Sequence, residues 1–179
     1  MEEKSYKILD EGQQLVVQLK ERYPKAMEFV EPKEVVVLAI EDAPPKSKDW
    51  DARTHIMKGA IKAILELAKY PVKFYIELYE SEWKTWSNQY RQWLMFHELL
   101  HIPPPEASGL VKHDIEDFAV VLDKVGIEWQ TAVALPDMLT GAPVQFSQRL
   151  LDRIHPKEED AEKPEAADAK EGKAVALTE

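Results

Sequence analysis

The order of apolar and polar positions near the N-terminus predicts a helix followed by a strand. Apolar residues recur at roughly helical spacing until Pro24 closes the segment; they are Ile8, Leu9, Leu15, Val16 and Leu19. The run over 34–40, EVVVLAI, is short, rich in β-branched residues and bounded by prolines. We therefore expect a buried strand there.

Two further segments before residue 81 carry strand patterns. The segment 54–69, THIMKGAIKAILELAK, has apolar spacing that suits a helix, but its first half also alternates around Gly59. We expect a strand over 54–61 and a short helix after it. The segment 73–80, KFYIELYE, alternates apolar and polar residues and predicts a strand with at least one partly exposed side.

The second half of the chain is expected to be mainly helical. A helix is predicted over 88–101, with Ser87 or Asn88 as its cap and Pro103 beyond its end. A loop containing Gly109 leads to a second helix over 111–124, which Gly126 would terminate. Two shorter helices are expected over 136–139 and 146–154.

One pentapeptide in the expected 88–101 helix has the spacing of a metal site. Residues 97–101 read HELLH, and residues four apart lie on one face of a helix, about 6 Å apart along its axis. The imidazoles of His97 and His101 can therefore converge on one ion, while Glu98 projects where it can take a proton from water. The surrounding residues are mostly apolar, which indicates burial, and buried imidazoles need partners. A zinc ion would supply one partner to both.

A catalytic zinc usually has three protein ligands and one open position. His113 is the best candidate for the third ligand, because it follows His101 by 12 residues after a proline-containing loop that can reverse the chain. His55 and His155 are expected to be solvated or otherwise satisfied. Glu106, in the loop, is a possible carboxylate ligand.

Zinc-binding histidines usually donate their second ring N–H to a carboxylate or a carbonyl. Asp117 lies one helical turn after His113, and Asp114 and Glu116 are close by. Any of the three could accept this hydrogen bond. For Glu116 the better explanation is a place in the first turn of a helix, where the helix dipole favours acidic groups.

The amino-acid composition limits the possible metal ligands and partners. The chain has no cysteine, so a metal site must be built from His, Asp and Glu. The net charge of −10 argues against nucleic acid as a partner, and no apolar run is long enough to span a bilayer. We expect a cytoplasmic protein without a membrane partner, since the N-terminus does not read as a secretory signal. Residues 156–179 are expected to form a disordered acidic tail after one domain over 1–155.

The two histidine segments together resemble a known family. HELLHI at 97–102, GLVKHDIEDF at 109–118 and VGIEW at 125–129 are similar to the pattern of the phage-type metallopeptidase family, and the resemblance covers roughly 35–129. It implies an α+β, zincin-like fold, in which a small twisted mixed sheet packs on an active-site helix and a second helix follows the third ligand. It also implies His97, His101 and His113 as metal ligands and Glu98 as the catalytic residue.

These features predict a metallopeptidase that uses Zn²⁺ to hydrolyse peptides or unfolded proteins. Zinc would lower the pKa of its water, and Glu98 would act as general base. The strand over 73–80, if it forms the sheet edge, could pair with an extended substrate.

Three alternatives stay open. They are a catalytically idle zinc-binding domain that acts as a protein-interaction module, a protease for proteins crosslinked to DNA, and another zinc hydrolase. Glu98 argues against the first, because a structural zinc site needs no carboxylate there. The second would want a basic patch or a nucleic-acid module, which the sequence does not suggest.

Overall fold

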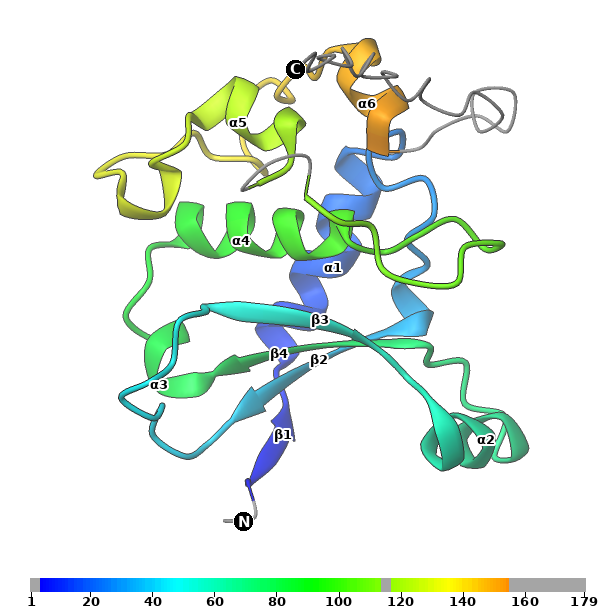
Figure 1. Ribbon diagram of the computed structural model, residues 1–179. Helices are drawn as coiled ribbons and strands as arrows, with labels where there is room; N and C mark the ends of the chain where they lie inside the picture. Colours follow the sequence, from blue (N-terminus) through cyan, green and yellow to red (C-terminus); the bar gives the residue numbers. More distant parts are fainter. Residues whose placement is uncertain (1–3, 114–116, 155–179) are drawn as a thin grey trace, which may run out of the picture.

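The computed structural model describes residues 4–113 and 117–154. The elements lie in layers, with a four-stranded sheet below, α1 and α4 on one of its faces, and α5 and α6 above them (Figure 1). The strands are β1 (Tyr6–Ile8), β2 (Val35–Ile40), β3 (Ala52–Ile56) and β4 (Phe74–Tyr79). The α-helices are α1 (Asp10–Arg22), α2 (Gly59–Leu67), α3 (Glu80–Trp83), α4 (Asn88–Leu100), α5 (Ala119–Val125) and α6 (Gln148–Ile154), with short 3-10 helices at Pro32–Glu34 and Trp129–Thr131.

The sheet is mixed, and its strand order is β1-β2-β4-β3. β2 and β4 are parallel neighbours, whereas β1 and β3 run antiparallel to the strands they pair with. β4 therefore lies inside the sheet. The suggestion that the strand over 73–80 could form an edge of the sheet is wrong, because β4 pairs with β2 on one side and with β3 on the other.

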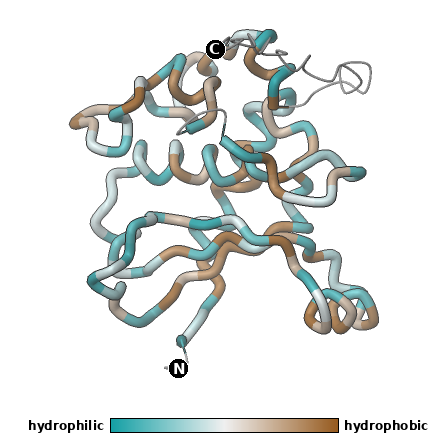
Figure 2. Tube along the Cα trace, in the orientation of Figure 1, coloured by the Kyte–Doolittle hydropathy of each residue, from teal (hydrophilic) through white to brown (hydrophobic). Residues whose placement is uncertain are grey.

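One face of the sheet packs on α1 and α4 and forms the core. The buried core residues of these elements include Val35, Val37, Ala39, Ile76 and Leu78 from the sheet, Val16 and Leu19 from α1, and Trp93, Phe96 and Leu100 from α4. Gly12 allows the close approach of α1 to β2, because a Cβ there would lie 2.7 Å from Val37 Cγ1. Figure 2 shows these hydrophobic stretches between sheet and helices, and a further one on α2 at the lower right.

Several predicted elements are confirmed. The N-terminal helix, the strands within 34–40 and 73–80, and the helix within 88–101 are present, and α6 lies within the predicted 146–154. Ser87 caps α4, since its side chain accepts a hydrogen bond from Tyr90 N. Ser87 rather than Asn88 is therefore the cap.

Other boundaries differ from the prediction. The strand expected over 54–61 is β3, which ends at Ile56, and α2 begins at Gly59, where φ is +58°. The helix expected over 111–124 is α5, which begins at Ala119. Val111, where the helix was expected to start, is hydrogen-bonded to His101 instead, and Phe118 N donates to Asp117 Oδ1 just before α5. β1 was not predicted, as its three residues are all exposed and carry no burial pattern.

The helix expected over 136–139 is also wrong. Side chains of α4 use the backbone groups of this segment: Trp93 Nε1 donates to Pro136 O, and Met138 N donates to Gln92 Oε1. Asp137 Oδ1 also accepts from the main-chain N–H groups of Leu139 and Thr140, two and three residues further along the chain. An aspartate turn held by α4 replaces the helix.

Candidate metal centre

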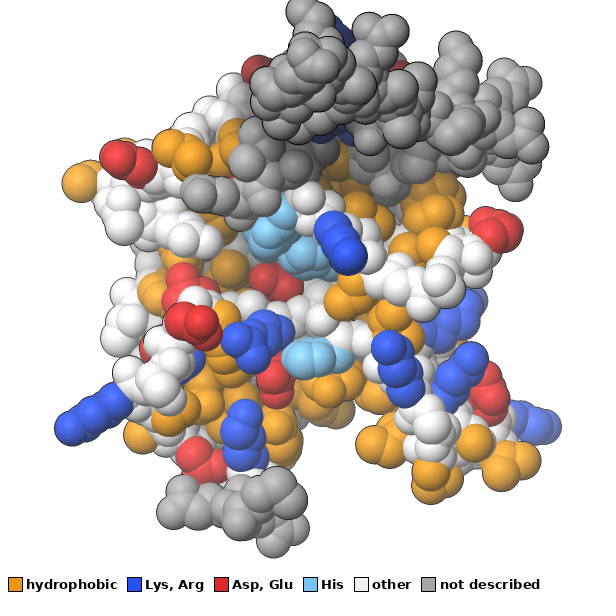
Figure 3. Space-filling view, viewed as in Figure 1, with side chains coloured by type: hydrophobic (Ala, Val, Ile, Leu, Met, Phe, Trp, Pro, Cys, Tyr) orange, Lys and Arg blue, Asp and Glu red, His pale blue; other side chains and the backbone are white. Residues whose placement is uncertain are grey.

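Histidine side chains gather in a hollow at the centre of one face of the molecule (Figure 3). His97 lies in α4, His101 is the residue that ends this helix, and His113 lies beyond the following loop. His113 Nε2 lies 3.1 Å from His97 Nε2 and 3.2 Å from His101 Nε2. The structure thus brings together the three histidines that the sequence singled out, with one nitrogen of each within 4.8 Å of the others.

The loop between the two histidine segments is closed by Val111. Val111 N donates to His101 O over 2.9 Å, and His101 Nδ1 lies 2.7 Å from Val111 O. A carbonyl oxygen can only accept, so the ring proton of His101 sits on Nδ1. Its Nε2 lone pair is therefore directed at the cluster. His113 lies two residues after Val111, so the hydrogen bonds between Val111 and His101 also bring His113 close to His101.

Asp117 orients the ring of His97. His97 Nδ1 lies 2.7 Å from Asp117 Oδ1, and Trp129 Nε1 donates to Asp117 Oδ2 over 2.6 Å. Burial tends to raise the pKa of Asp117, but the contacts with His97, Trp129 and Phe118 N outweigh it and lower that pKa. A charged Asp117 keeps the proton of His97 on Nδ1, which leaves Nε2 for an ion. Asp114 and Glu116, the other two acidic candidates, lie outside the described residues.

The donor set fits a zinc ion. Two nitrogens bound at about 2.0–2.1 Å to one tetrahedral ion lie roughly 3.4 Å apart, close to the 3.1 and 3.2 Å found here. Burial lowers the pKa of His101 to about 4, so this ring is neutral and able to coordinate near pH 7. Three imidazole nitrogens without a thiolate suit zinc and also copper, iron or nickel.

Phe118 forms an apolar wall behind the cluster. Its ring centroid lies 5.3 Å from that of His97, 4.9 Å from that of His101 and 5.1 Å from that of His113. Phe118 is 1% exposed. Water is thereby kept from this side of the three rings, which strengthens electrostatic interactions between them and an ion.

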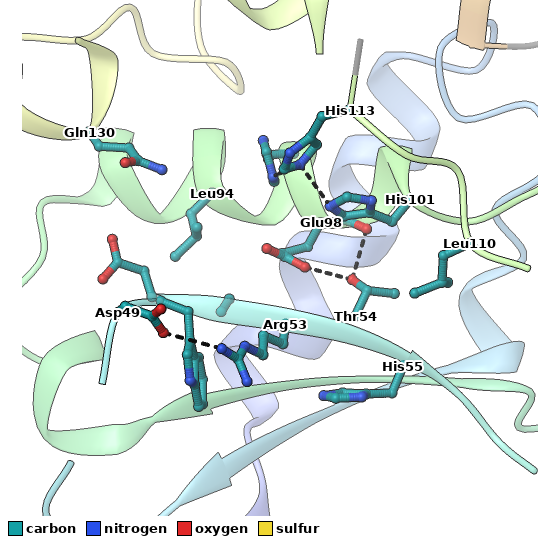
Figure 4. A pocket seen from close by; sticks show the side chains of 14 residues that line it. Asp49, Arg53, Thr54, His55, Leu94, Glu98, His101, Leu110, His113 and Gln130 are labelled. Atoms are coloured by element: carbon teal, nitrogen blue, oxygen red, sulfur yellow. Dashed lines mark hydrogen bonds and ion pairs between the residues drawn. The ribbon is translucent and has the colours of Figure 1, made fainter. Parts of the chain in front are cut away.

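Glu98 points from α4 toward β3, where it meets Thr54 (Figure 4). Thr54 Oγ1 lies 2.7 Å from Glu98 Oε2 and 2.9 Å from the main-chain oxygen of Glu98. Burial raises the pKa of Glu98, and the nearby His97 and the hydroxyl of Thr54 oppose this rise. A charged Glu98 accepts a hydrogen bond from Thr54; a neutral one can donate to Thr54 while Thr54 donates to the main chain. Thr54 can thus hold this carboxyl in both protonation states.

Thr54 is a site residue that the sequence did not reveal. It lies 44 residues before Glu98 in the chain, and nothing in its surroundings distinguishes it from other strand residues. Its side chain is buried on the core-facing side of β3, next to α4. Only the packing of strand against helix brings it to Glu98.

A cleft of about 320 Å³ lies between α4 and β3. The three histidines and Glu98 line it, together with residues 49–55. His55 borders it but is satisfied as expected, since its Nε2 lies 3.0 Å from Glu77 Oε1 and its ring stacks on Tyr75. Glu106 is exposed and does not join the histidines in any possible ligand group of the described residues. His155 lies outside the described residues.

Comparison with known protein families identifies a related family. The sequence model of a family described as putative phage metallopeptidase matches residues 3–136, about three quarters of the chain. The matched region contains all three clustered histidines, together with Glu98, Thr54 and Asp117. No curated protein and no solved structure shows a significant match.

Proposed function

Because the chain belongs to the putative phage metallopeptidase family, we propose that it is a zinc-dependent peptidase with a zincin-like active site. His97, His101 and His113 hold the zinc in this proposal, and Glu98 is the general base. The observation that carries it is the convergence of three Nε2 atoms beside a buried carboxyl, on the wall of an open cleft. The zincin-like reading is supported by an HExxH helix packed on a mixed sheet, with a third histidine delivered after a loop.

Different residues of the chain have different roles in the proposed hydrolysis. A bound zinc would lower the pKa of a water molecule and polarise the carbonyl of the scissile bond. Glu98 takes a proton from the attacking water and later passes it to the leaving amine. Asp117 and the carbonyl of Val111 keep the protons of His97 and His101 on Nδ1, so that both Nε2 atoms stay available.

β3 supports an extended peptide as the substrate. One side of β3 pairs with β4, and in residues 4–113 and 117–154 no strand pairs with its other side. Residues 52–55 of β3 also line the cleft. A substrate strand added to β3 would therefore run beside Glu98, held by backbone hydrogen bonds that any extended chain can make. This arrangement favours unfolded or flexible proteins, and β3 takes the place first considered for the 73–80 strand.

The proposal includes a cytoplasmic location and a protein substrate rather than nucleic acid, in keeping with the net charge of −10. The chain reconstituted with zinc should cleave unfolded casein. A chelator such as 1,10-phenanthroline should stop the cleavage, and added zinc should restore it. His113→Ala should weaken zinc binding at least about 100-fold, because it removes one of three protein ligands.

Two results would count against this function. A wild-type chain that takes up no zinc after reconstitution would remove the metal site. A chain that binds zinc tightly but cleaves no unfolded or flexible substrate would favour the catalytically idle interaction module instead.

A further inference from the structure

The connection between β3 and β4 is much longer than the sheet requires. These strands are antiparallel neighbours whose last pair is Ile56 with Phe74, and Met57 N continues the ladder by donating to Lys73 O over 2.7 Å. A turn of roughly two to five residues is enough to join strands that end this way. The chain instead inserts residues 58–72, which include α2. The sheet itself gives no reason for this insertion.

The inserted helix is apolar and uncovered. Ile61, Ile64, Leu67 and Tyr70 are 61%, 62%, 84% and 65% exposed, and no residue of α2 is buried. α2 projects from the corner of the sheet, and Figure 2 colours it mostly as hydrophobic. A helix that is apolar around most of its circumference normally lies in a protein core or in lipid. Something must therefore cover α2 when the protein works.

The helix nevertheless has a regular C-terminal end. Gly59 opens it with a left-handed φ of +58°. At the other end Tyr70 N donates to Leu65 O over 2.9 Å, and Lys69 takes the left-handed φ of +57° that such a helix ending uses. The inserted segment thus contains a regular helix and is not an irregular loop.

Lysines accompany the apolar residues of this insertion. Residues 58–72 contain Lys58, Lys62 and Lys69 but one acidic residue, Glu66, so the insertion carries a net charge of +2 in a chain of net charge −10. These four residues follow one another at helical spacing and form a narrow polar stripe. Figure 3 shows the same combination at the lower right, where basic side chains border hydrophobic ones over α2.

We propose that α2 docks the protein on an anionic lipid surface. Ile61, Ile64 and Leu67 would enter the boundary between headgroups and acyl chains, while the lysines contact lipid phosphates. Tyr70 suits the same boundary, because its ring is apolar and its hydroxyl polar. The inference rests on α2 alone and not on the peptidase function.

Such docking is peripheral and needs no spanning helix; among the described residues, no helix is long and apolar enough to cross a bilayer. The sequence-based expectation of no membrane partner rested on the absence of an apolar run long enough to cross a bilayer. That argument does not apply to a helix that binds only the membrane surface. Since β3 lines the cleft and leads directly into residues 58–72, docking would hold the cleft beside the lipid surface.

A second copy of the chain fits α2 less well than lipid does. A symmetric contact between two α2 helices would give the lysines no anionic partner other than Glu66. A protein groove would cover one face, whereas the apolar positions of α2 occupy most of its circumference; they are Ala60, Ile61, Ala63, Ile64, Leu65, Leu67 and Ala68. Nucleic acid would match the lysines but leave the apolar residues uncovered.

The test is sedimentation of the full chain with vesicles of phosphatidylcholine alone and with about a quarter phosphatidylglycerol. Wild type should bind the anionic vesicles, more weakly as salt rises, and should not bind the neutral ones. Ile64→Glu/Leu67→Glu should lower the partition coefficient at least about tenfold. Because both side chains are exposed, this variant should keep its thermal stability. Lys58→Glu/Lys69→Glu should weaken binding to the anionic vesicles in the same direction.

The matched control is Ile127→Glu/Val133→Glu, which changes two other apolar side chains that are 65% and 105% exposed. It should bind the anionic vesicles like wild type, apart from a small effect of the added negative charge. The proposal is overturned if wild type binds neither vesicle, or if the control loses binding as much as the α2 variant. It is also overturned if wild type is a dimer that ignores vesicles and Ile64→Glu/Leu67→Glu dissociates it, because α2 would then contact a second copy.

Discussion

Thr54 contacts both the carboxyl and the main-chain oxygen of Glu98, so it can act as a positioning residue for the proposed general base. Thr54→Val removes the hydroxyl and keeps the shape of the side chain. We expect kcat to fall about 10- to 100-fold, because the carboxyl loses the partner that fixes its orientation. KM and zinc affinity should change less than about twofold, since Thr54 touches no ligand nitrogen in the described contacts.

Thr54→Ser is the control, because it restores the hydroxyl and should recover most of kcat. A purely structural role for Thr54 would give a different pattern. Thr54→Val would then lower thermal stability and zinc content together, and the serine variant would not recover turnover selectively.

Asp117 is predicted to act through His97. Asp117→Asn removes the charge that keeps the proton of His97 on Nδ1, and the loss of such a partner typically weakens metal affinity about 10- to 100-fold. Competition with a chromophoric zinc chelator measures this change. Asp123→Asn, at a partly exposed position in α5, is the matched control and should bind zinc like wild type. Equal affinities for both variants and wild type would show that Asp117 does not orient His97.

Among single residues, those whose geometry is encoded locally could be predicted from the sequence. His97, Glu98 and His101 share one helix, so their spacing alone places them. His113 followed from the need for a third ligand after a loop. Thr54 could not be found in this way, because its contact with Glu98 depends on how β3 packs against α4.

At the scale of elements, the end of α5 depends on one glycine. Gly126 has φ +80° and ψ 170°, a conformation that residues with a Cβ avoid. Gly126→Ala should lower the free energy of unfolding by about 1–3 kcal/mol, measured by urea denaturation of the metal-free chain. Gly109→Ala is the matched control, because its backbone has no positive φ and a Cβ there would meet nothing within 4 Å. Equal losses of unfolding free energy in the two variants would mean that the positive φ of Gly126 is not the cause of the destabilisation.

The elements that the sequence predicted well carry strong patterns of their own. β2 and β4 are flanked on both sides by other strands, and α4 has a side-chain cap. The wrongly predicted elements lie where contacts with residues distant in the sequence determine the backbone conformation. Val111 is bound to His101 and is not part of a helix, and 136–139 is not helical because Trp93 and Gln92 bind its backbone.

At the scale of the whole molecule, the candidate site joins segments that are far apart in the chain. Thr54 comes from the sheet edge, Glu98 and two histidines from α4, and Asp117 from the region before α5. Assembly of the site therefore requires the fold as a whole. The sequence alone indicated a metal site through HELLH and His113, and the three histidines do lie together. It indicated neither the order of the strands nor the edge position of β3.

The stability of the metal-free chain should depend on pH through His101. Burial lowers the pKa of His101 from 6.5 to about 4 in the folded state. Between these values the unfolded chain binds a proton that the folded chain does not, so this contribution to stability rises with pH. Acidification from pH 6.5 to pH 4 should remove up to about 3 kcal/mol, as the shift corresponds to roughly 1.4 kcal/mol per pKa unit.

The raised pKa of Glu98 acts in the opposite direction above its ordinary value of 4.5, because the folded chain then retains a proton that the unfolded chain releases. Asp117, whose pKa is lowered, contributes only as the pH falls below its ordinary value of 3.8. Comparison with His101→Gln isolates the histidine, since the other groups remain in both chains. Urea denaturation across this pH range should give a flatter profile for His101→Gln. Parallel profiles would mean that His101 is not buried as a neutral ring.

The most direct test of the metallopeptidase assignment compares wild type, Glu98→Gln and the exposed loop variant Glu106→Gln in zinc content and in kcat/KM on unfolded casein. We predict one zinc per chain in all three, activity in wild type and Glu106→Gln, and a loss of at least about 100-fold in Glu98→Gln, which retains the shape of Glu98 but cannot take a proton. Wild-type activity in Glu98→Gln with zinc still bound would contradict the role of Glu98, and a wild-type chain that binds no zinc would contradict the metal site itself.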